Sequence, residues 1–158
     1  MVNDTLVPDA IESMAVMFRA AVASLNIPAS AVFDGPPTGT AIPMEYVCVG
    51  WSTSGPPDVA GVAAEEENAI RSEEFDVLCQ VSVASGDTNV PALSARAGVI
   101  LSAIGTALRA DRELGGLLSA MQGRADRTGA FNWERGATDA GMEVTVSFVV
   151  HVSVGWLP

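Results

Sequence analysis

The segment that decides the fold is MEVTVSFVVHVSVGW, residues 142–156. Apolar side chains occupy its even-numbered positions, and polar side chains occupy most of the odd ones, with Val149 as the bulky exception. Successive side chains of a β-strand point to opposite faces of a sheet, so this alternation predicts one long strand with an apolar face and a polar face. The apolar face needs a cover, and two earlier stretches with helical periodicity can supply it.

The first helical stretch covers residues 8–25, with Pro8 suited to its first turn. The second begins after an N-cap at Thr88 or Asn89 and runs to about residue 111. Each carries one apolar stripe at helical spacing. The stripes are Ile11, Met14, Phe18, Ala21, Val22 and Leu25 in the first helix, and Leu93, Ala97, Ile100, Leu101, Ile104 and Leu108 in the second. Gly98 and Gly105 leave the second helix smooth in places, which permits close packing.

Several shorter stretches have the β-branched and aromatic composition of strands. The segment 130–135 is separated from the opening strand by a glycine-rich run at 136–141, which predicts an antiparallel hairpin. Residues 45–51 are apolar on both faces, which indicates a central position in the sheet. The predicted strands are 31–34, 45–51, 74–84, one or two within 117–134, and 142–156.

The order of these elements is not the strict strand–helix alternation of a doubly wound parallel fold. We therefore expect the α+β class, with two amphipathic helices packed on one face of a largely antiparallel, or mixed, sheet. The length of 158 residues suits a single domain over 1–158. Residues about 52–71 are predicted to form a long irregular loop, and loops of this length in compact domains are usually functional or mobile.

Composition excludes several classes of protein. The chain is 49% hydrophobic with a mean hydropathy of +0.32, so it can build a core. No uninterrupted apolar run approaches the roughly 20 residues of a membrane span, and the N-terminal residues lack the pattern of a signal peptide. We therefore expect no membrane partner and assembly in a cytosol.

The net charge is −11, from 19 acidic and 8 basic residues, and all the basic residues are arginines. Affinity for nucleic-acid phosphates comes from lysine and arginine, so the composition argues against specific nucleic-acid binding. Two interpretations of the acidity remain open. It keeps a rather apolar protein in solution, or it provides a surface to which DNA does not adhere.

The residues that carry enzyme chemistry are sparse. His151 is the single histidine and lies mid-strand without a nucleophile motif, so the sequence offers no Ser–His–Asp arrangement. Cys48 and Cys79 lie in apolar strands without ligand spacing and are interpreted as buried thiols, with a disulfide open only if their strands are neighbours. There is no phosphate-binding glycine motif. We expect no enzyme, no metal and no cofactor.

The remaining polar residues of interest are candidates for an interface. The acidic run in the predicted loop has Arg71 as its nearest counter-charge, and Arg124 and Arg127 bracket an aspartate. Glu143 and His151 lie on the polar face of the last strand. The predicted interface set is Glu65, Glu66, Glu67, Arg71, Arg124, Arg127, Glu143 and His151.

The layout of the whole chain resembles the tail terminator (tail completion, or minor tail) proteins of long-tailed bacteriophages. The resemblance rests on the N-terminal helix 8–25, FDGP at 33–36, the apolar strand 46–51, the acidic loop, the strand from 74, the long helix with Arg96 and Ala97, LGG at 114–116 and the valine-rich final strand. It is a likeness of layout rather than of one diagnostic motif.

This resemblance implies a structural virion protein without catalytic residues, assembled in the host cytoplasm and located at the tail or neck. The family's subunits form a hexameric ring that caps the tail tube and meets the head-side connector or stopper. The implied partners are therefore other copies of the chain, the tail tube protein and the connector, while genomic DNA passes through without specific binding. Neighbouring subunits would cover the polar sheet face and the open sheet edges.

Two other interpretations stay open. One is another ring component of a neck or tail, such as a head–tail joining or tail tube protein. The other is a small-ligand-binding α+β domain that uses a cleft between helices and sheet.

Overall fold

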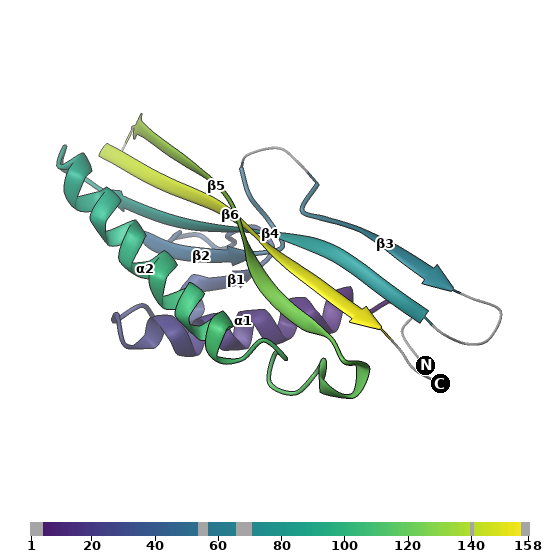
Figure 1. Ribbon diagram of the computed structural model, residues 1–158. Helices are drawn as coiled ribbons and strands as arrows, with labels where there is room; N and C mark the ends of the chain where they lie inside the picture. Colours follow the sequence, from purple (N-terminus) through teal and green to yellow (C-terminus); the bar gives the residue numbers. More distant parts are fainter. Residues whose placement is uncertain (1–4, 54–56, 66–70, 140, 156–158) are drawn as a thin grey trace.

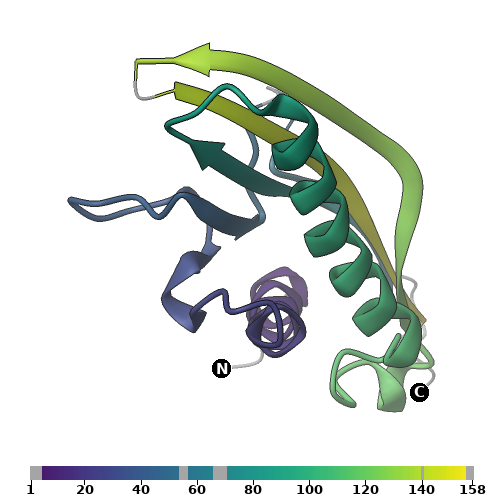
Figure 2. The same ribbon diagram turned by 90° about the vertical axis from the view of Figure 1, so that its left-hand side faces the viewer.

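The computed structural model describes residues 5–53, 57–65, 71–139 and 141–155. They form a layer of two helices on one face of a six-stranded sheet, which curves around them (Figures 1 and 2). The α+β prediction is confirmed. The elements are α1 (Val7–Ala23), α2 (Val90–Ala110), β1 (Val32–Asp34), β2 (Glu45–Val49), β3 (Val59–Glu65), β4 (Arg71–Ser85), β5 (Arg124–Thr138), β6 (Gly141–Gly155) and the 3-10 turns η1 (Ala29–Ala31) and η2 (Ser119–Met121).

The strands β4 and β6, which share the longest unbroken pairing, form the centre of the sheet. They run antiparallel in unbroken register from Ser72↔Gly155 to Ser85↔Met142. Directly opposed residues share a face, so two apolar rows meet and face the helices. These rows, Phe75, Val77, Cys79, Val81 and Val83 against Val144, Val146, Phe148, Val150 and Val152, are all buried. The alternation predicted from residues 142–156 is confirmed for the described part of that strand.

The strand order is β1-β2-β4-β6-β5, with β3 also paired to β4. β1 and β2 are parallel, and every other pair is antiparallel, so the sheet is mixed. β2 lies between β1 and β4, in agreement with its apolar residues on both faces.

The predicted irregular loop at about 52–71 is wrong for residues 59–65, which form β3. This strand pairs antiparallel with the first half of β4, from Val59↔Val77 to Glu65↔Arg71, while β2 pairs with the second half. At the junction of the two halves, the Leu78 carbonyl accepts a hydrogen bond from the Trp51 amide, after β2. The Leu78 amide donates to the Asp58 carbonyl, before β3. Alanine and glycine dominate β3, so its sequence has neither alternation nor high β-propensity, and the pairing with β4 fixes it.

β5 and β6 form the predicted hairpin, but the strands are longer and the turn is shorter than the sequence indicates. Pairing continues to Thr138↔Gly141, which places the predicted loop residues Gly136 and Ala137 within β5. Gly141 has φ +138°, and a Cβ there would lie 2.1 Å from the Ser85 carbonyl oxygen, so glycine is required. An irregularity between Arg127 and Phe131 shifts the register once.

Side chains from the sheet fix both helices. The buried carboxylate of Glu73 accepts hydrogen bonds from the Leu6 amide (2.9 Å) and the Thr5 hydroxyl at the N-terminus of α1, where a negative charge is favourable. The Asn89 side chain caps α2 by accepting from the Ala92 amide, as predicted. Arg96 of α2 donates to the Glu45 carboxylate of β2 and to the Leu25 carbonyl, each at 2.6 Å.

By length and composition, α2 is apolar enough to cross a membrane, although the sequence shows no uninterrupted apolar run of that length. In the structure its apolar stripe is buried against β4, β6, β5 and α1, as Figure 2 shows for the layers. The core therefore accounts for the apolar stripe of α2, whereas 33% of the most apolar stretch of the helix is buried in all.

The contact between Phe148 of β6 and Phe18 of α1 offers a test of the fold. Both rings are buried, with centroids 6.3 Å apart. We predict that Phe148→Ala lowers the free energy of unfolding by about 3–5 kcal/mol, because it leaves a cavity between sheet and helix. The adjacent Val149→Ala, on the polar face, should cost less than about 1 kcal/mol. Urea unfolding measures both, and equal losses would contradict this two-layer arrangement.

Candidate functional site

The face of the sheet that the helices do not cover is polar, and part of it is buried. The chain leaving β2 lies on this face, where Ser52 and Thr53 contact Gln80 of β4 and Ser147 of β6. Ser52, Gln80, Ser82 and Ser147 are buried there. Sequence reasoning predicted a polar face but not this cluster, because the covering loop has no pattern that places it over the sheet.

Gln80 is fully buried, and its two amide atoms have different surroundings. Its Oε1 accepts from the Ser52 hydroxyl at 3.1 Å and from both the amide and the hydroxyl of Thr53 at 3.0 Å. These donors fix the orientation of the amide. Its Nε2 has no partner with the geometry of a normal hydrogen bond among the described residues, although the Gln80 side chain interacts with the Tyr46 hydroxyl. Gln80 also borders an open space on this face of the sheet.

That space is a pocket of about 310 Å³, which we call the acidic pocket. Pockets for small ligands begin at roughly this size, so it suits one side chain better than an extended molecule. It is lined by Tyr46, Thr53, Gln80, Glu134, Arg135, Gly136, Ala137, Thr138, Glu143 and Thr145.

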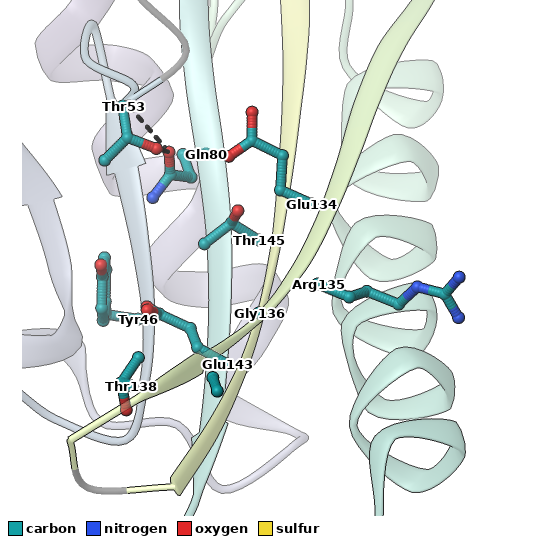
Figure 3. A pocket seen from close by; sticks show the side chains of 10 residues that line it. Tyr46, Thr53, Gln80, Glu134, Arg135, Gly136, Thr138, Glu143 and Thr145 are labelled. Carbon is teal, nitrogen blue, oxygen red and sulfur yellow. Dashed lines mark hydrogen bonds between the residues drawn. The ribbon is translucent and has the colours of Figure 1, made fainter.

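The side chains of the acidic pocket give it a negative character. Figure 3 shows Glu134 and Glu143 on the same side as Tyr46, Gln80 and Thr145, whereas Arg135 extends to the other side, toward α2. Glu143, one of the predicted interface residues, accepts a hydrogen bond from the Ser82 hydroxyl at 2.6 Å. Burial raises the pKa of the Tyr46 hydroxyl, and the Glu143 charge adds to this rise, whereas hydrogen bonds with the Ser82 and Gln80 side chains oppose it.

A second polar group lies farther along the same face. His151 Nδ1 is 2.7 Å from Asp76 Oδ1 on β4, and Asp126 of β5 is opposite His151 in the register. Arg124 and Arg112 pair with Asp126 at 2.5 and 3.3 Å. The hydrogen bond from Arg124 is the main cause that lowers the pKa of Asp126. Arg124, one of the predicted interface residues, thus has a carboxylate partner within the chain.

The other predicted interface residues are not brought together with this group. Glu65 and Arg71 are opposite each other in the β3–β4 register, and Glu66 and Glu67 lie outside the described residues. Arg127 is exposed on the helix side of β5 and has no ion-pair partner in the described part of the chain.

Several side chains on the helix side of β5 are exposed to solvent, which the sequence did not indicate. Residues Arg127, Phe131, Trp133 and Arg135 share this side, and we call them the β5 strip. Phe131 is 61% exposed and Trp133 is 37% exposed. β5 is an edge strand, and only part of it packs on α2, where Trp133 and Arg127 lie over the helix glycines Gly98 and Gly105.

The two cysteines are buried and form no disulfide. Cys48 is opposite Gln80 in the register, and Cys79 precedes Gln80 on β4, so the two thiols point to opposite faces of the sheet. Burial raises the pKa of each thiol to about 12. Within the described ranges, no group of three or more His, Cys, Asp or Glu residues could hold a metal ion.

No protein-family model and no curated protein matches the chain. Among solved structures, a chain of the virion of a native gene transfer agent (GTA) particle is similar, with a TM-score of 0.53 and 16% sequence identity. The match covers 90% of this chain and 91% of that chain. The two chains share a fold. The near-complete coverage of both means that helices and sheet correspond as one unit.

The buried thiols predict how stability responds to alkaline pH. In an unfolded chain a cysteine ionises near pH 8.5, whereas folding holds these thiols protonated to about pH 12. Their contribution is therefore fully present below about pH 8.5 and is lost as the pH rises toward 12, by up to about 1.4 kcal/mol per thiol per pH unit. Urea unfolding between pH 8 and 11 should show this loss, and Cys48→Ala/Cys79→Ala should reduce it. An unchanged loss in the double variant would contradict the assignment.

Proposed function

We propose that the protein is a structural subunit of a phage-like virion, which forms a ring at the end of the tail tube next to the head. The observation that carries this proposal is the shared fold with a GTA virion chain over 90% of one chain and 91% of the other. The resemblance of the sequence layout to tail terminator proteins adds the position within the particle and the expected hexameric order.

The surfaces of the subunit suit assembly better than catalysis. β5 and β3 leave strand edges unpaired within the described chain, and such edges are usually covered in a native assembly. The chemistry-bearing residues that the sequence singled out are either buried thiols or members of ion pairs on the sheet face. The acidity of the chain suits a ring through which DNA passes without adhering.

A second candidate is another ring component of the neck or tail, since the fold alone does not distinguish positions in a particle. A third is a small-ligand-binding domain, favoured by one observation. An apolar groove of about 700 Å³ lies between α1 and the end of α2, within the size range of ligand sites. Its lining includes Val16, Met17, Ala20, Ala107 and Leu114.

Deletion of the gene for this protein from the particle's genome tests the tail-end assignment. Without a terminator, tube growth has no stop, so we predict tails of variable and excessive length that do not join heads. Electron microscopy of lysates measures tail length, and supply of the chain from a plasmid should restore it. Tails of normal length that stay separate from heads would favour the joining role, and normal whole particles would contradict all virion roles.

A further inference from the structure

The acidic pocket lacks a cation of its own. Glu134 and Glu143 line it, the guanidinium of Arg135 points away, and no ion pair of either glutamate occurs among the described residues. A guest that satisfies both glutamates therefore carries a cation. An arginine side chain supplies one, with a planar guanidinium that suits two carboxylates.

The β5 strip, on the opposite side of the sheet, has positive charges that lack a negative partner. Arg127 and Arg135 are exposed and have no carboxylate partner in the ranges that the structure describes. Phe131 and Trp133 lie exposed between them. Exposed aromatic side chains next to arginines are the residue types that dominate binding energy at protein interfaces. This surface therefore suits an acidic partner.

The spacing of charges on the two surfaces matches. Arg127 and Arg135 are opposite Val150 and Val144, six β6 positions apart. On the polar face, Glu134 is opposite Thr145, and the Asp76–His151 pair lies six β6 positions farther along. At about 3.3 Å per residue, both spacings are about 20 Å. A strip laid along the polar face thus places one arginine at the acidic pocket and the other at Asp76.

We propose that the occupant is a second copy of this chain, whose β5 strip lies on the polar sheet face of its neighbour. One strip arginine enters the acidic pocket and pairs with Glu134 and Glu143. The other arginine meets the exposed carboxylate of Asp76. Because strip and pocket lie on opposite sides of one sheet, the contact is head-to-tail, and repetition gives a ring or a filament. The inference rests on the proposed ring and names its subunit contact.

Charge reversal tests this contact in the full-length chain. We expect the wild type to associate, with a mass that rises with concentration in light scattering at low salt. Arg127→Glu/Arg135→Glu and Asp76→Arg/Glu134→Arg should each weaken association by more than about tenfold, because like charges then oppose each other. An equimolar mixture of the two variants should regain it, since each reversed surface then finds an opposite charge. That recovery also shows that both variants are folded.

A matched control is Glu12→Arg/Asp34→Arg, which makes the same change of net charge as Asp76→Arg/Glu134→Arg at exposed sites on α1 and β1, outside both surfaces, and should associate as the wild type does. The proposal is overturned if the wild type stays monomeric, if the reversed variants associate normally, or if their mixture stays dissociated.

The result is separable from the tail-end assignment. If the wild type binds tail-tube ends and the reversed variants still associate normally, this contact is rejected and the ring role is retained. Association that follows the charges, without any binding to tail ends, retains the contact and rejects the tail role.

Discussion

The antiparallel pairing of β4 with β6 is the constraint on which the rest of the structure depends. Both strands have 15 residues, and their register fixes which of the two sheet faces each of their side chains points to. A slip of β6 by one residue would turn its apolar row away from the helices and bury Glu143 and His151 under them. Desolvation of those charges would be far more costly than the loss of any single apolar contact. The apolar rows therefore determine where the helices pack, and they leave the polar face available for other contacts.

The same pairing explains why candidate interaction groups lie on both sides of the sheet. β5 extends the sheet beyond α2, so its helix-side residues are only partly covered and the β5 strip is left open. Gly98 and Gly105 let Arg127 and Trp133 lie close to the helix surface. On the polar side, the chain after β2 covers Gln80 but leaves the acidic pocket beside it. A subunit with a cationic, aromatic strip on one side and carboxylates on the other is suited to head-to-tail assembly.

Much of the fold follows from local patterns in the sequence. The periodicity of Met14, Phe18 and Val22 and the N-cap at Asn89 predict the two helices, and the alternation in β6 predicts its buried face. β3 could not be predicted, because its alanines and glycine form a strand only through pairing with β4. The role of Glu73 at the N-terminus of α1 depends on a contact across 67 residues of sequence, which leaves no local signal.

The candidate site was predicted only in part, again because some of its contacts join residues that are distant in the sequence. Glu143 and His151 were identifiable because strand parity alone places them on the polar face. The acidic pocket is also formed by Gln80, Glu134 and the loop that follows β2. These groups are brought together by the register of β4, β5 and β6, which the sequence does not reveal. The exposure of Phe131 was not predicted, because no periodicity in β5 encodes how little of this edge strand packs on α2.

The central claim is that copies of this chain meet through the β5 strip and the polar sheet face. Hydrogen–deuterium exchange, compared between dilute and assembled protein, tests it most directly. The account predicts that assembly slows exchange at residues 127–138 and along the open face near the acidic pocket, while α1 is unchanged. Slowed exchange confined to α1 and the groove beside it, with β5 exchanging as in the dilute protein, would contradict it.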